Sequence, residues 1–148
     1  LPIAFVVTTG SKGHLPQETH VQLVKQVETI VPPDSDVVFL GDGEFDGTIL
    51  QQTLDSYGWS YVCRTAKNTQ LNEDGNWFAF SDIGVQPGNC IGLEQVSFTE
   101  QAYGPVLAVA WWAADYKQPI YLVSNLDLVD EACYWYTRRF CIETFFSD

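Results

Sequence analysis

One short apolar run constrains the fold of this 148-residue chain more than any other feature. Val37-Val38-Phe39-Leu40 is continuous rather than alternating, which is typical of a β-strand covered on both faces, and Gly41-Asp42-Gly43 follows it. Helical spacing of apolar residues then runs from Ile49 to Tyr57, Gly58 suits a helix C-cap, and Trp59 to Arg64 is again strand-like. A strand, a helix and a strand in this order predict a right-handed crossover between parallel strands. We therefore expect an α/β domain.

The flanking segments extend this pattern. We expect a strand over Leu1 to Thr9, a helix from Pro16 to Val31 and another strand over Pro119 to Val123. Residues 66–118 differ, because turn signals alternate there with short aromatic and β-branched runs, and they predict a β-rich insertion. A last helix should begin near Asp127 and run to the end of the chain, and its apolar residues cover most of its girth, which predicts a buried helix.

The composition suits one folded domain. Hydrophobic residues make up 46% of the chain, which is enough for a core, and no apolar run approaches the roughly 20 residues of a membrane span. We expect a cytoplasmic protein that makes no membrane contact. The chain starts at Leu1 and contains no methionine, so we also expect it to be a piece of a longer or processed polypeptide.

The charge and the cysteines limit the possible partners. The net charge of −12 repels a polyanion, so a role in nucleic-acid binding needs metal ions, a local basic patch or basic segments outside these residues. Cys63, Cys90, Cys133 and Cys141 form no C-x-x-C motif. We predict that all four are reduced thiols in the core.

Three polar residues recur at helical spacing near the C-terminus. Offsets of three and seven residues put Tyr136, Arg139 and Glu143 on one stripe of a helix. A phenol, a guanidinium and a carboxylate on one stripe can hold a metal and a phosphate together. The alternative is that Arg139 and Glu143, four residues apart, pair with each other.

Asp42 adds a second carboxylate, because it follows a buried strand at the edge where open α/β sheets place their sites. Asp42 and Glu143 together predict a site for Mg²⁺ or Mn²⁺, which prefer oxygen ligands. Two such ions can activate a water or a 3′-hydroxyl against a phosphodiester. Glu44 and Asp46 are either further ligands or solvated turn residues.

This ordered set of motifs resembles the DDE transposases of bacterial insertion sequences. The chain matches them in Gly41 to Asp46, in Tyr61 to Arg64, in the β-rich insertion and in Tyr136 to Glu143, and the branch it resembles has a Tyr, Arg, Glu, Lys signature. The resemblance implies a ribonuclease-H-like fold, in which an Asp-Asp-Glu triad binds two Mg²⁺ (or Mn²⁺) ions, and a catalytic C-terminal helix. It implies an enzyme that cleaves DNA at transposon ends and transfers the strands to target DNA, with a possible homodimer in the synaptic complex, in the bacterial cytoplasm and at the nucleoid.

The resemblance also assigns roles to single residues. It makes Asp42 the second catalytic aspartate and Glu143 the catalytic glutamate, both as metal ligands, while Tyr136 and Arg139 bind phosphates of the transposon end. Arg64 and Lys67 lie at and after the end of the next strand, and they either contact the DNA backbone or are solvated surface residues. Trp111 and Trp112 either stack on bases or pack within the insertion.

Three departures from the family pattern shape our expectations. The signature lysine would fall two residues beyond Asp148, Gly43 stands where an arginine is common, and the first aspartate would precede Leu1. Residues 1–148 are then a fragment of one ribonuclease-H-like catalytic domain that lacks its first two strands. Leu1 to Thr9 becomes the third strand, which we expect to have no neighbour to pair with.

The same departures leave the function open among three possibilities. We expect the parent protein to be a transposase and the isolated fragment to be inactive. The alternatives are a truncated or repurposed, non-catalytic transposase remnant that acts as an interaction module, and an unrelated acidic α/β domain with chance matches.

Overall fold

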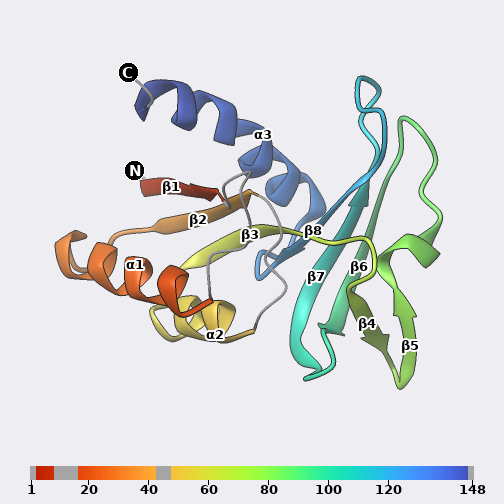
Figure 1. Cartoon of the computed structure of the whole chain (residues 1–148), viewed down its shortest axis with the longest axis horizontal. Helices are drawn as coiled ribbons and strands as arrows, with labels where there is room; N and C mark the ends of the chain where they lie inside the picture. Colours follow the sequence, from red (N-terminus) through yellow and green to blue (C-terminus); the bar gives the residue numbers. More distant parts are fainter. Residues whose placement is uncertain (1–2, 9–16, 43–47, 147–148) are drawn as a thin grey trace.

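The computed structural model describes residues 3–8, 17–42 and 48–146, and within them the chain forms a mixed α/β fold (Figure 1). One eight-stranded sheet has the order β1-β2-β3-β8-β7-β6-β4-β5. Its strands are β1 (Ile3–Thr8), β2 (Val37–Asp42), β3 (Ser60–Thr65), β4 (Gln70–Glu73), β5 (Asn76–Ala79), β6 (Cys90–Phe98), β7 (Tyr103–Trp111) and β8 (Ile120–Ser124). The helices are α1 (Gln17–Ile30), α2 (Ile49–Ser56) and α3 (Val129–Phe146), with a short 3₁₀ turn at Phe80–Ile83.

The predicted crossover is confirmed. Strands β2 and β3 pair in parallel, α2 connects them, and Gly58 lies just beyond α2 at a φ of +71°, a left-handed conformation that glycine adopts without a steric penalty. Helix α1 connects β1 to β2 in the same way, and it too joins parallel strands.

The expectation that Leu1 to Thr9 has no neighbour is wrong. Strand β1 pairs in parallel with β2 over six residues, from Ile3 opposite Val37 to Thr8 opposite Asp42. The physical reason is that a buried strand such as β2 offers backbone hydrogen-bonding groups along both of its edges, and β1 satisfies those on the side away from β3.

The two faces of the sheet are covered by different helices (Figure 1). Successive side chains of a strand point to opposite faces, so β2 contributes Val37 and Phe39 to one hydrophobic cluster and Val38 and Leu40 to the other. The first cluster includes buried residues of α1 and α2, and the second includes Ala132 and Tyr136 of α3. A continuous apolar strand was predicted for this reason.

Residues 66–118 contribute strands to the same sheet. Strands β4 to β7 are antiparallel to their neighbours, and β8 lies between β7 and β3, antiparallel to both. Trp111 and Trp112 are half-buried and pack against the two hydrophobic clusters, and Trp112 Nε1 donates a hydrogen bond of 3.0 Å to the Tyr116 carbonyl. Both indoles therefore contribute to core packing.

Asn125, directly after β8, links several elements. Its Nδ2 donates to Asp55 Oδ1 of α2 at 2.8 Å and to the Trp59 carbonyl at 2.9 Å, and its Oδ1 accepts from the backbone N–H of Tyr61 at 2.8 Å. The Tyr103 hydroxyl of β7 donates to the second oxygen of Asp55. These hydrogen bonds connect α2 and β7 to the paired strands β3 and β8.

Helix α3 begins at Val129, near Asp127 as predicted. Two residues of the helices are more exposed than predicted. Tyr134 is 52% exposed, although the apolar sequence of α3 predicted a buried helix. Tyr134 precedes buried Tyr136 by two residues, about 200° around the helix, so it faces away from the sheet. Ile49, the first of the apolar residues whose helical spacing predicted one buried face for α2, is 53% exposed, while Leu50 beside it is buried. None of the helices in the described ranges is long and apolar enough to cross a membrane.

Candidate functional site

A hydrogen bond joins two of the predicted site residues. The hydroxyl of Tyr136 donates to Oδ1 of Asp42 at 3.1 Å, although 94 residues separate the two in the chain. Asp42 is the last residue of β2 and is half-buried, whereas the side chain of Tyr136 is fully buried in the cluster beneath α3. A buried hydroxyl from a separate motif therefore contacts one oxygen of the Asp42 carboxylate.

Arg64 lies on the strand beside Asp42. In the parallel register Cys63 is opposite Gly41, so the next residues, Arg64 and Asp42, occupy neighbouring positions on the two strands. Strand alternation puts Arg64 on the same face as Val62, and Asp42 on the same face as Leu40, which is the face that α3 covers. A half-buried cation and a half-buried carboxylate thus share one face at the carboxyl ends of adjacent strands.

Lys67 lies beyond the end of β3 and is exposed. Parallel strands place their carboxyl ends at one edge of the sheet, so Lys67 follows Arg64 at the edge where Asp42 lies. The structure therefore groups Asp42, Arg64 and Lys67 at one edge.

Arg139 and Glu143 belong to α3, three and seven residues beyond Tyr136. The backbone of α3 is helical through both positions, as predicted. Their side chains lie outside the described part of the structure, as do the predicted pairing of Arg139 with Glu143 and residues Gly43, Glu44 and Asp46.

A metal site would draw on hard oxygen ligands. Within the described part of the chain there is no group of three or more His, Cys, Asp or Glu side chains that could hold a metal ion. Asp42 fits Mg²⁺ or Mn²⁺ as a single carboxylate ligand, and its hydrogen bond to Tyr136 has the form of the outer contacts that orient metal-binding carboxylates. A complete site requires further carboxylates, of which Glu143 is the predicted one.

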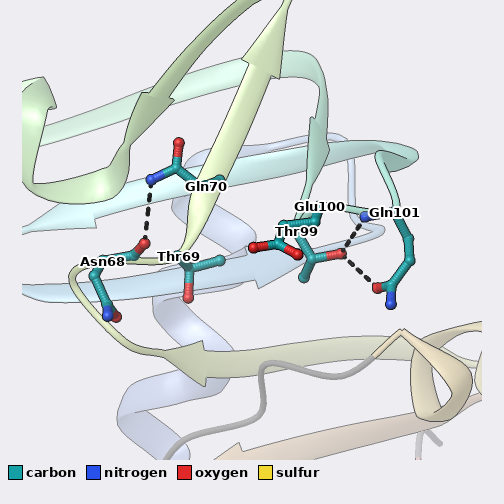
Figure 2. A pocket seen from close by; sticks show the side chains of 6 residues that line it. All are labelled: Asn68, Thr69, Gln70, Thr99, Glu100 and Gln101. Atoms are coloured by element: carbon teal, nitrogen blue, oxygen red, sulfur yellow. Dashed lines mark hydrogen bonds between the residues drawn. The ribbon is translucent and has the colours of Figure 1, made fainter.

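A polar hollow of about 280 Å³ lies between the β3–β4 turn and the β6–β7 turn (Figure 2). It is lined by Asn68, Thr69, Gln70, Thr99, Glu100 and Gln101. Gln70 Nε2 donates to the Asn68 carbonyl at 3.4 Å, and the hydroxyl of Thr99 donates to Gln101 Oε1 at 2.9 Å. Both bonds are drawn as dashed lines in Figure 2. This hollow could not be predicted from the sequence, because its lining residues come from two distant turns and the start of β4, and their approach depends on β4 pairing with β6.

The prediction that the four cysteines are reduced core thiols is wrong for Cys90, which is not in the core, and the side chain of Cys141 lies outside the described part of the structure. Cys63 is fully buried as expected, and burial raises its pKa. Cys90 is exposed, and its sulfur lies 3.8 Å from that of half-buried Cys133. No sequence signal could have found this pair, because the two cysteines are 43 residues apart on a strand and a helix.

Comparisons with known proteins bear on the family of this chain. The family model described as "Transposase DDE domain" matches residues 1–148, which is the whole chain. Searches of the curated proteins and of the solved structures each found no match. Because the match covers the whole chain, it shows that this chain belongs to the transposase DDE domain family.

Proposed function

We propose that this chain provides the second aspartate and the glutamate of a DDE transposase centre. The observation that carries the proposal is the 3.1 Å hydrogen bond between Tyr136 and Asp42, since it joins residues from two separate motifs at the end of a buried strand. A ribonuclease-H-like arrangement of the complete domain is part of the proposal. The mixed α/β fold, with a parallel β1-β2-β3 unit, is compatible with it.

Each residue has a stated task in this proposal. Asp42 and Glu143 bind the ions, and Tyr136 holds the Asp42 carboxylate in one orientation. Two Mg²⁺ or Mn²⁺ ions, when bound, supply activation of a water or 3′-hydroxyl and stabilisation of the leaving oxygen. Arg139 contacts a phosphate through its planar donor fork, and Arg64 adds a cation on the strand next to Asp42. The phosphate-binding role that the resemblance gives Tyr136 would require a movement of this buried side chain.

The partners follow from the same chemistry. The substrates are the DNA of transposon ends and target DNA in the bacterial cytoplasm and nucleoid, and a homodimer would bring two ends together. With a net charge of −12, the domain needs metal ions and the local cations Arg64 and Lys67 to approach DNA. DNA affinity should therefore depend on the divalent ion more strongly than it does for a basic protein.

The 148 residues alone should not cleave DNA. A three-carboxylate centre needs another aspartate besides Asp42 and Glu143, and we propose that a longer reading frame supplies it. The 148-residue chain should show no Mg²⁺-dependent nicking of a supercoiled plasmid. Robust nicking that disappears in Asp42→Ala would show that it is active by itself.

The protein of the complete reading frame provides the main test. Cleavage of its own transposon ends should fall by at least about 10³-fold in Asp42→Ala and in Glu143→Ala, as expected when a metal ligand is lost. Asp115→Asn is the matched control, because Asp115 is an exposed carboxylate in the β7–β8 connection, and it should leave cleavage unchanged. Cleavage that survives both alanine variants would overturn the proposed roles.

A second candidate is a non-catalytic remnant that acts as an interaction module. The strongly acidic surface favours it, because such a surface disfavours DNA and suits a protein partner. A complete reading frame that encodes no further aspartate strand and whose product cleaves no DNA would favour this candidate over the enzyme.

A further inference from the structure

Two thiols from separate elements meet on the α3 side of the sheet. Cys90 is the first residue of β6, and Cys133 is the fifth residue of α3. Their sulfur atoms are 3.8 Å apart, and neither cysteine is in a disulfide bond. The proposed transposase chemistry uses neither residue.

The packing of α3 on β6 fixes this approach. At Gly92, a β-carbon would lie 2.1 Å from Cγ2 of Val129, so the absent side chain lets the first residue of α3 rest directly on the strand. Gly92 and Cys90 point to the same face of β6, about 7 Å apart, and Val129 and Cys133 are one helical turn apart, about 6 Å. The spacing along the strand is close to the spacing along the helix. The contact of Val129 with Gly92 therefore places Cys133 next to Cys90.

We propose that Cys90 and Cys133 are a modification site, at which a low-molecular-weight disulfide such as oxidised glutathione converts the two thiols into an intramolecular disulfide bond. The sulfurs must approach by roughly 1.8 Å to reach the bond length of about 2.05 Å. Rotation about the side-chain torsions of the two cysteines can bring their sulfur atoms closer.

The exposure of the two residues sets the order of the steps. The thiolate of exposed Cys90 attacks one sulfur of oxidised glutathione and releases one glutathione thiolate, leaving a mixed disulfide on Cys90. The thiolate of Cys133 then attacks the Cys90 sulfur and releases the second glutathione thiolate. The protons lost by the two cysteines end on the two glutathiones, so two protein thiols are oxidised and one disulfide is reduced to two thiols.

The surroundings keep the reaction slow at neutral pH. Burial, together with the nearby Cys90 and Asp130, raises the pKa of Cys133 to about 12, and burial also raises the pKa of Cys90. Thiolate is the reacting form, so the rate of closure should increase with pH.

The disulfide bond would link α3 covalently to β6. Cys133 lies three residues before Tyr136 on α3, so the bond would fasten α3 at β6 while Tyr136 contacts Asp42 at the end of β2. Its formation depends on the packing of α3 and not on the proposed transposase activity.

The test is oxidation of the purified 148-residue chain in glutathione buffers of increasing oxidised fraction. We expect the wild type to lose two free thiols, to decrease in mass by two hydrogen atoms and to stay monomeric. Peptide mapping should find Cys90 joined to Cys133. Closure of a loop of about 40 residues should raise Tm by about 10 °C under oxidising conditions. Cys90→Ser and Cys133→Ser should show no intramolecular bond and no such rise.

Cys63→Ala is the matched control, because Cys63 is a fully buried thiol on β3, and it should oxidise as the wild type does. The peptide map of the wild type tests the proposal even if a variant fails to fold. The proposal is overturned if the map joins a different pair of cysteines, or if both thiols stay free in oxidised glutathione at a pH where a model thiol is fully oxidised.

Discussion

Replacing Tyr136 by phenylalanine isolates the contact on which the candidate site rests. The substitution keeps the fully buried ring and removes only the hydroxyl that donates to Asp42 at 3.1 Å. A hydrogen bond to a charged group contributes about 1.5–3 kcal/mol, and the half-buried position of Asp42 lets water replace part of it. We therefore expect Tyr136→Phe to lower the free energy of unfolding by about 1.5 kcal/mol, with a fall in Tm of about 3–6 °C.

Tyr61 provides a control of the opposite sign. It is as deeply buried as Tyr136, but its hydroxyl has no hydrogen-bond partner among the described residues. Removing an unpaired buried hydroxyl relieves a desolvation cost, so Tyr61→Phe should leave the free energy of unfolding unchanged or raise it by about 1 kcal/mol. Urea denaturation followed by tryptophan fluorescence measures both variants under the same conditions.

A double-mutant cycle assigns the effect to the pair. Tyr136→Phe combined with Asp42→Ala should give a coupling energy of about 1 kcal/mol, because each single change already removes the bond. If the coupling energy is zero, or if the two tyrosine variants change stability equally, the bond between Tyr136 and Asp42 does not position the carboxylate and the reasoning fails.

Three further predictions address packing and ionisation. Gly92→Ala should destabilise the fold by about 1–3 kcal/mol in urea denaturation, because the new methyl group meets Val129, and Val129→Ala in the same chain should restore part of the loss. Asn125→Ala should cost about 2–4 kcal/mol in the same assay, since two backbone groups and a carboxylate lose their partner; a change below about 0.5 kcal/mol would contradict the role of the amide. The reduced protein should lose stability as pH rises above 9.0, the ordinary thiol pKa, because the raised pKa values of Cys133 and Cys63 keep both thiols protonated when folded, while both ionise when unfolded. Cys63→Ala should weaken this dependence, and a free energy of unfolding that stays constant from pH 9 towards 12 would refute it.

The local elements could be predicted because their signals are local. Val37 to Leu40 is apolar without alternation, and the strand is indeed covered on both faces. Gly58 marked the end of α2 through its backbone freedom, and the spacing of Tyr136 with Arg139 and Glu143 predicted the helix that carries them. Each of these inferences needed no more than a few neighbouring residues.

The pairing of distant segments could not be predicted in this way. Nothing in Ile3 to Thr8 indicates that this strand adds to β2, because any apolar strand can pair through its backbone. The approach of Cys90 to Cys133 depends on where α3 crosses β6, and the burial of Tyr136 depends on which side of an almost wholly apolar helix faces the sheet. Asp42 and Tyr136 were each chosen from their own motif, and only the fold shows that they touch.

The position of β8 in the sheet has a consequence for synthesis of the protein on the ribosome. Strand β3 ends at Thr65, but β8, its neighbour, is complete only at Ser124. At about 5–20 residues per second, the roughly 60 intervening residues take about 3–12 s to translate, and during that time the inner edge of β3 has no partner. An unpaired apolar edge is a template for aggregation, so a chaperone that binds extended strands should act on this nascent chain in the interval before residue 124 emerges.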